Sequence, residues 1–425
     1  GSVEVNDSSG NLSIAGGSIG ANGQLKVGGQ STLNLAGDLT VAGKLNLHPH
    51  SNFNLAGNTL NAEGARLEIG GERSFDTITT NENTTLQVNS YLNLSRTDSG
   101  TSTIGNLELI MLDGDSGSNS LEIGNMNLVV GGTATLDGKQ ITINNGDLSF
   151  SNPQGTPSFT NSTSLSVNNG ALSFQGTSSF SNSSSLSVSN GALSFQGTSS
   201  FASSSLTVSN GEMILQSGGS FSNTSLVFTS SIFKPSGAVS LTGSSSFNLN
   251  DTSSIQLQGA TTLSQSGTVL WPSIDLNGTA LTLTVTEMYC CLHQTGGLTI
   301  GAGEKIITGA SIFNVDNPLT IKSGGTLTSG SGNVQIDGAL TLDGELVQGG
   351  GTLELKGNGS VTGKLDMSGA TLSLGSEYGL NITGTLAANS SSVWSGLVGT
   401  IDLSTGKLES SGGEIDLNKF TTSAD

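Results

Sequence analysis

The sequence predicts an all-β protein, a single parallel β-solenoid with about three short strands in each coil of about 20–21 residues. The first observation is an internal repeat, because Gly170–Phe180 recurs without change one coil later as Gly191–Phe201. The second is that apolar residues alternate with Ser, Thr, Asn or Lys within each repeat, which is the period of a strand with one buried face. Such short strands are unstable alone, so we expect stacked, right-handed coils whose inward side chains form ladders.

The same period recurs from the first coils to the last. The apolar pairs repeat once in each coil as Leu25/Val27 and Leu45/Leu47, then Leu33/Leu35 and Phe53/Leu55, then Leu165/Val167, Leu186/Val188 and Leu206/Val208, and finally Leu298/Ile300, Leu319/Ile321 and Leu340/Leu342. Between strands, Asn145, Asn169, Asn190 and Asn210 each precede a glycine. Asn and Gly tolerate positive φ, so we expect sharp corners here, with Asn amides stacked on one another.

Residues 1–2, Gly1-Ser2, have the form of a remnant of tag cleavage, and we expect residues 3–425 to form one continuous solenoid. The pattern loosens near 74–119 and near 270–317. These two stretches are predicted to be either loops that project from the solenoid or widened coils that accommodate larger residues. Loops on a rigid scaffold commonly carry binding sites, so both stretches are expected to be the places where a binding site lies.

Each irregular stretch contains one group of candidate binding residues. Asp113-Gly114-Asp115 offers carboxylate and carbonyl oxygens, the ligands of Ca²⁺, and we expect no cofactor other than calcium at Asp113 and Asp115. In the second stretch, Trp271, Tyr289 and His293 are the candidate ligand-binding residues. No catalytic residue is predicted.

The two cysteines, Cys290 and Cys291, are adjacent in the sequence. They can close a vicinal disulfide that fixes a tight turn or remain as two thiols, with His293 two residues away. The CxxC spacing of redox sites is missing, which favours a structural role. His48-Pro49-His50 is half of a metal site that a neighbouring coil would have to complete.

Composition excludes two broad classes of function. The chain holds 13 Lys and Arg against 32 Asp and Glu, a net charge of −19, so it lacks the basic face of a nucleic-acid binder. No apolar run approaches the roughly 18–20 residues that cross a membrane, so we expect no membrane span in these residues.

Two further functional classes, polysaccharide-processing enzymes and ice-binding proteins, also use β-solenoid folds. Many β-helices process polysaccharides with converging carboxylates, and Asp337, Asp343 and Glu345 are the acids that stacked coils could bring together. Ice-binding solenoids carry Thr-X-Thr in every coil. Here Thr282, Thr284 and Thr286 form one local run, and we expect Ser and Thr elsewhere to follow no fixed column.

The repeated Gly-Ala-Leu-Ser-Phe-Gln-Gly-Thr unit and Gly-Gly-Thr-Leu-Glu-Leu (350–355) resemble the β-helical passenger domains of bacterial autotransporter and filamentous-haemagglutinin-type surface adhesins. The resemblance extends over most of the chain at the level of the repeat. It implies export across an envelope, display on the outer membrane, and adhesion or self-association as the activity, with no catalytic residues to transfer.

The sequence therefore predicts an extracellular, cell-surface adhesin or stalk segment without enzymatic activity. The expected partners are glycans or proteins of a host or neighbouring cell, or another copy of the solenoid, and no nucleic acid. The alternatives are a structural matrix or surface-layer component and a polysaccharide lyase or glycoside hydrolase.

Overall fold

A computed structural model of the chain describes most of the 425 residues. The described ranges are 1–5, 11–28, 31–48, 52–54, 58–62, 65–69, 73–75, 78–79, 85–88, 91–95, 101–104, 106–109, 120–124, 127–131, 134–137, 140–250, 252–265, 269–271, 274–276, 279–285, 291–294, 297–375, 377–389, 391–395, 400–402 and 407–410. Every regular element among these residues is a β-strand, and every strand pairing is parallel. The described chain is therefore all-β, as the alternating pattern predicts.

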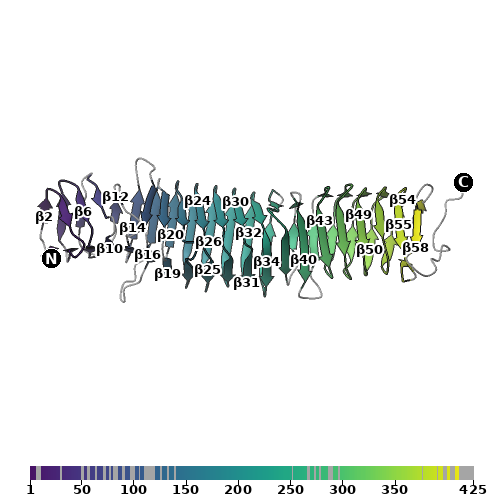
Figure 1. Ribbon diagram of the computed structural model, residues 1–425, viewed down its shortest axis with the longest axis horizontal. Coiled ribbons are helices and arrows are strands. Elements are labelled where there is room, and N and C mark those ends of the chain that lie inside the picture. Colours follow the sequence, from purple (N-terminus) through teal and green to yellow (C-terminus); the bar gives the residue numbers. More distant parts are fainter. Residues whose placement is uncertain are drawn as a thin grey trace. The chain divides into compact units, whose positions relative to one another are not determined.

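The chain forms two compact units, Gly1–Ser217 and Gly218–Asp425. Each unit is a parallel β-solenoid, in which a strand pairs with its counterpart in the next coil, as Leu165 does with Leu186. Figure 1 shows the strands of each unit side by side as successive rungs. The predicted solenoid fold is thus confirmed within each unit, whereas its handedness and its continuity between units stay predictions.

Unit 1 extends from β1 (Ser2–Val5) to β30 (Glu212–Leu215) and makes three short strands per coil in its best-described part. The strands of these coils are β20 (Gln140–Asn144), β21 (Leu148–Phe150), β22 (Ser158–Thr160), β23 (Ser164–Asn168), β24 (Ala171–Phe174), β25 (Ser178–Ser181), β26 (Ser185–Ser189), β27 (Ala192–Phe195), β28 (Ser199–Ala202) and β29 (Ser205–Ser209). β20, β23, β26 and β29 form one sheet, and β21, β24 and β27 form a second with β30. β22, β25 and β28 form the third.

In the best-described coils of unit 1, much of the core is made of ladders of identical side chains. Leu165, Leu186 and Leu206 lie in register and are at most 1% exposed. Two phenylalanine ladders accompany them: Phe150, Phe174 and Phe195 form the first, and Phe159, Phe180 and Phe201 form the second. Rings stack within each ladder at 4.4–5.0 Å, and the two ladders meet edge to face. Because the sequence repeats, the same contact between stacked aromatic rings recurs in each of these coils.

One corner in each of the best-described coils of unit 1 lies at an Asn-Gly dipeptide. Asn145, Asn169, Asn190 and Asn210 all have φ between 51° and 56°. The side-chain amide of Asn169 donates to Oδ1 of Asn145 at 3.2 Å, which confirms the predicted stacking of Asn side chains for this pair. The glycine that follows each of the last three Asn residues lies directly against the backbone of the neighbouring coil.

Unit 2 extends from β31 (Gly219–Ser222) to β58 (Lys407–Ser410) and has the same three-strand coil. Its best-described strands are β42 (Leu298–Ile300), β43 (Lys305–Gly309), β44 (Ile312–Val315), β45 (Leu319–Ile321), β46 (Thr326–Ser329), β47 (Val334–Ile336), β48 (Leu340–Leu342), β49 (Glu345–Gln348), β50 (Thr352–Leu355), β51 (Gly359–Val361), β52 (Lys364–Asp366), β53 (Thr371–Leu374), β54 (Gly379–Ile382) and β55 (Thr385–Ala388). The predicted ladder of Leu298, Leu319 and Leu340 is paired in register and buried. Aliphatic ladders thus replace most of the aromatic core here.

Candidate functional site

The residues predicted to bind ligands lie mostly outside the described part of the chain. Asp113, Asp115, Tyr289 and Cys290 are all outside it, so the calcium and vicinal-disulfide predictions stay predictions. The remaining three lie on neighbouring strands of one sheet, Trp271 on β38 (Val269–Trp271) and Cys291 and His293 on β41 (Cys291–Gln294). The register places Gln294 beside Trp271 and His293 beside Leu270. Both strands thus continue the stacking of unit 2 within the second irregular stretch.

The described residues do not assemble a metal centre from the usual ligands. His48 directly follows β7 (Lys44–Leu47) and its side chain is exposed, whereas His50 lies outside the described residues. No group of three or more His, Cys, Asp or Glu side chains gathers among the residues that the structure describes.

The three acids considered for catalysis are each bound to a different partner on the next coil of unit 2. Asp337 pairs with Nζ of Lys356 at 3.4 Å. Asp343 accepts a hydrogen bond from the Thr362 hydroxyl at 2.5 Å, and Glu345 pairs with Nζ of Lys364 at 3.0 Å. Hydrolysis of a glycosidic bond needs two carboxyl groups that face one substrate. These contacts instead use the acids to connect successive coils.

Lys364 is the centre of an ionic cluster on the outer surface of β49 and β52. Its ammonium group lies 3.0 Å from Glu345 and 3.1 Å from Asp366, and it is 40% exposed. Partial burial on its own would raise the pKa of Asp366, but hydrogen bonds from Ser368 and Lys364 outweigh it and lower the pKa. Hydrogen bonds to Glu345 and Asp366 raise the pKa of Lys364. Both shifts stabilise the charged forms that make up the cluster.

We expect this cluster to make unit 2 less stable in acid. A lowered carboxyl pKa stabilises the folded state above the ordinary value of 3.8, and that contribution is lost as the pH falls through the lowered pKa. Because the groups are partly exposed, the loss should be about 0.5 kcal/mol. Urea denaturation at pH 7 and at pH 3, followed by hydrogen exchange of peptides spanning 359–374, measures it. The Lys364→Met variant should lose less on acidification than the natural chain, and an equal loss in both would contradict this assignment.

A similar ionic cluster lies on unit 1, around Glu68 of β10 (Arg66–Ile69). Its Oε1 lies 2.6 Å from Nζ of Lys44 and 3.1 Å from Nε of Arg66. Partial burial opposes ionisation of Glu68, but the hydrogen bonds and charges of Lys44 and Arg66 lower its pKa. Because each basic group already has an acidic partner, the cluster offers little free positive charge to an anionic ligand.

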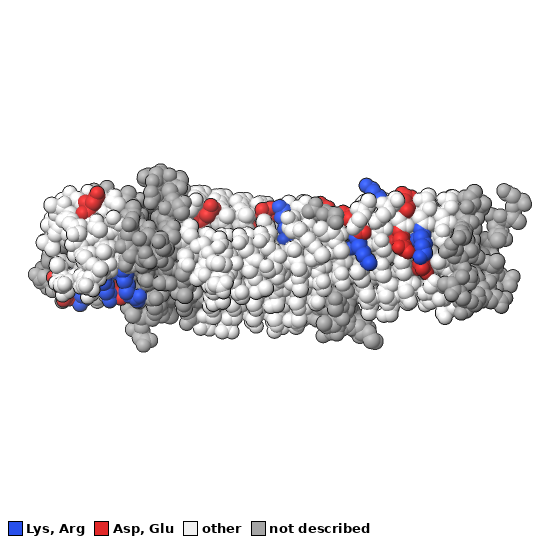
Figure 2. All heavy atoms as spheres, viewed as in Figure 1, with Lys and Arg blue, Asp and Glu red and all other residues white. Residues whose placement is uncertain are grey.

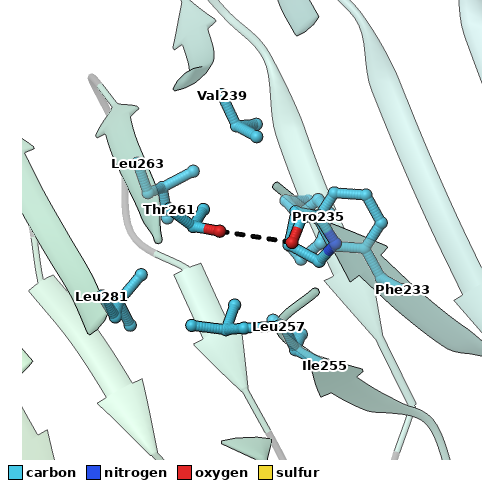
Figure 3. A pocket seen from close by; sticks show the side chains of 9 residues that line it. Phe233, Pro235, Val239, Ile255, Leu257, Thr261, Leu263 and Leu281 are labelled. Carbon is cyan, nitrogen blue, oxygen red and sulfur yellow. Dashed lines mark hydrogen bonds between the residues drawn. The ribbon is translucent and has the colours of Figure 1, made fainter. Parts of the chain in front are cut away.

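One small cavity lies inside unit 2 (Figure 3). It has a volume of about 20 Å³ and apolar walls that include Phe233, Val239, Leu257 and Leu263. The Thr261 hydroxyl at its edge donates to the carbonyl oxygen of Pro235 at 3.2 Å, which leaves no free polar group there. The volume is close to that of one water molecule, so the cavity is a packing defect and not a site for a sugar or cofactor.

The most distinctive surface of unit 1 is a sheet face covered with hydroxyl groups. Residues 140–233 include no Lys or Arg, and their acids are Asp147 and Glu212 alone. In Figure 2 few coloured side chains interrupt the white surface over the strands that are teal in Figure 1. The outward side chains of β23, β26 and β29, which we call the hydroxyl face, are Ser164, Ser166, Ser185, Ser187, Ser189, Ser205, Thr207 and Ser209 together with Asn168.

Strand pairing fixes these hydroxyl groups in straight columns. Ser166 pairs with Ser187 and Ser187 with Thr207, and no register shift interrupts the three strands. Neighbouring hydroxyls are therefore about 4.8 Å apart across strands and about 6.6 Å apart along them. The expectation that Ser and Thr follow no fixed column is wrong for this sheet. The sequence could have predicted these columns, because the outward Ser and Thr positions repeat with the same period as the inward Leu and Val.

The hydroxyl groups of the hydroxyl face are available for contacts with another molecule. None of its eight hydroxyl groups has a hydrogen-bond partner among the described residues. On the adjacent sheet, by contrast, the Ser173 hydroxyl donates to that of Ser149 at 2.9 Å. A hydroxyl both donates and accepts, so the face can bond to any surface rich in polar, uncharged groups.

Comparison of the sequence with protein-family models, with curated proteins and with solved structures gives no match. The resemblance to autotransporter and haemagglutinin-type adhesins therefore stays a prediction. Among the described residues, no helix is long and apolar enough to span a membrane.

Proposed function

We propose that this chain is a non-catalytic segment of an extracellular, cell-surface adhesin, and that the hydroxyl face is its contact surface. The observation that supports the proposal is the regular array of unpartnered hydroxyl groups on an uncharged stretch of a strongly acidic chain. The adhesin-like repeat agrees with display at a cell surface.

The partner that best fits the hydroxyl face is a second copy of the same face. Two copies of a chain with net charge −19 repel one another wherever their acids meet. Asp147 and Glu212 are the acids of residues 140–233, and neither lies on the hydroxyl face, so two copies can approach there without like charges in contact. Hydroxyl groups are complementary to themselves, and the small Ser side chains allow two sheets to approach closely.

The size of the hydroxyl face predicts weak individual contacts. Three strands of five residues cover roughly 200–250 Å², whereas a stable interface buries about 800 Å² on each partner. A single pair of faces should therefore dissociate readily in dilute solution. Many copies displayed on one surface would hold two surfaces together through the effective concentration of the remaining contacts.

The test is clustering of microspheres that carry the protein attached at one terminus. The natural chain should cluster the beads, and more so at 150 mM than at 10 mM salt, because the Debye length falls from about 30 Å to about 8 Å and screens the net charge. The double variant Ser166→Asp/Ser187→Asp should abolish clustering. The matched control is Ser173→Asp/Ser194→Asp, which adds the same charge at paired, half-buried outward positions of the adjacent sheet and should still cluster.

Equal behaviour of the two double variants would exclude the hydroxyl face as the contact. Retention of glycans by unclustered beads would assign the face to a carbohydrate partner instead. If new reducing or unsaturated ends appeared in a panel of polysaccharides, the chain would be an enzyme and the proposal of a non-catalytic adhesin would be wrong.

A further inference from the structure

One corner of unit 2 is lined by polar side chains that point inward. Thr308, Ser311, Ser329 and Gln348 are all at most 2% exposed. Thr308, Ser329 and Gln348 lie near the ends of β43, β46 and β49, which belong to three successive coils. Ser311 lies across the corner from Thr308, and its amide donates to the Thr308 carbonyl oxygen at 2.9 Å. The corner therefore contains a column of buried polar groups three coils high.

Only part of this polar column is satisfied by the protein. The Ser329 hydroxyl donates to the Gly332 carbonyl oxygen at 3.1 Å, and the Gln348 amide nitrogen donates to the same oxygen at 2.7 Å and also to that of Gly350. Three buried oxygens have no partner among the described residues, namely Thr308 Oγ1, Ser311 Oγ and Gln348 Oε1. Gln348 Oε1 can only accept, so the carbonyl groups around it cannot satisfy it.

We propose that ordered water molecules occupy this corner and satisfy the three oxygens. A buried water typically makes about three hydrogen bonds to polar groups that otherwise have none. A cation would meet the same oxygens, but none of the four polar side chains carries a negative charge to offset its burial. Water provides the donor that Gln348 Oε1 requires without that penalty.

The spacing of the coils requires two separate water positions. Thr308 and Ser311 flank one turn, so one water can bridge their hydroxyl groups. Gln348 is two coils further on, about 9–10 Å away, which exceeds the roughly 3 Å reach of a hydrogen bond. A second water must therefore serve Gln348 Oε1. There the corner is Gly349-Gly350-Gly351.

The column has a defined end within unit 2. In the next coil the position that follows Gln348 is Met367, which is fully buried, and in the coil after that it is Ala388. The inferred waters are thus confined to the coils that contain Thr308, Ser329 and Gln348, and apolar packing closes the corner beyond them.

The experiment compares Thr308→Val with Thr328→Val in the full chain. The first replaces a buried hydroxyl by a methyl group of the same shape, and the second does so on an outward side chain one coil further on. If water bridges Thr308, its valine variant should lower the hydrogen-exchange protection of residues 305–330 about fivefold. Thr328→Val should change it less than twofold.

If the corner contained no water, Thr308→Val would change the hydrogen-exchange protection in the opposite direction. Removing an unpartnered hydroxyl would then raise the protection of residues 305–330 in Thr308→Val, and that result would overturn the proposal. A crystal structure provides the independent readout. Density for water between the hydroxyl groups of Thr308 and Ser311 and beside Gln348 Oε1 is expected, and empty positions there would overturn it equally.

Discussion

Replacing Phe180 by alanine is expected to lower the free energy of unfolding of unit 1 by about 3–5 kcal/mol. The Phe180 ring is 1% exposed and stacks on Phe159 at 4.4 Å and on Phe201 at 4.5 Å. It also meets Phe174 edge to face at 5.9 Å. Phe195 makes a further edge-to-face contact with the Phe180 ring at 6.4 Å. Alanine would remove all four ring contacts and leave a hole that stacked coils cannot close, because hydrogen bonds on both sides fix their spacing.

The measurement is urea denaturation, with hydrogen exchange of peptides spanning 155–205 to show where protection is lost. Phe180→Leu is the volume-conserving control and should cost less than about 1.5 kcal/mol. Ser179→Ala changes the adjacent outward residue and should stay within about 0.5 kcal/mol. If Phe180→Ala cost no more than Ser179→Ala, the aromatic ladders would not be the stabilising core of unit 1.

The ladders could be predicted from the sequence because inward positions tolerate little change. Period-two alternation assigns Leu165 and Val167 to the inside, and the repeat then brings Leu186 and Val188 beside them. The structure confirms both pairings. Corners were predicted correctly at Asn-Gly dipeptides such as that of Asn190, because Asn and Gly tolerate positive φ. Ser183 and Ser203 adopt positive φ as well, and no Asn-Gly signal marks those corners.

Ionic contacts between coils were harder to predict, because coil length varies. The ladder of unit 2 advances in equal steps, from Leu298 to Leu319 and from Leu319 to Leu340. A step of the same length from Glu345 leads to Asp366, which would place two carboxylates together. The coil here is shorter, and Glu345 instead pairs with Lys364, 19 residues on. A change of two residues keeps each side chain on its face but exchanges a repulsive neighbour for an attractive one.

The hydroxyl face was missed for a different physical reason. Outward residues are not selected by burial, so a mixture of Ser, Thr and Asn carries no strong period of its own. Their columns become visible only after the inward ladder fixes the register, which places Ser166 beside Ser187. The candidate residues of the two irregular stretches lack such a ladder, and their roles stay predictions.

Replacing Gly191 by alanine is expected to lower the free energy of unfolding of unit 1 by about 3 kcal/mol. A Cβ on Gly191 would lie 1.9 Å from the carbonyl oxygen of Gly170 in the neighbouring coil. The same oxygen accepts a hydrogen bond from Ala192 at 3.1 Å, so it cannot move away without loss of that bond. The methyl group would therefore force two coils apart at the corner.

Gly20→Ala is the matched control, because a Cβ there would meet no heavy atom within 4 Å, and its effect should stay within about 0.5 kcal/mol. Urea denaturation of both variants measures the difference, and equal stabilities would show that the coils are less tightly stacked than their geometry indicates. The consequence extends to function, since Gly191 closely follows the strand that carries Ser185 and Ser187. Displacement of that coil would break the columns of the hydroxyl face, so Gly191→Ala beads should cluster less than Gly20→Ala beads at equal protein density.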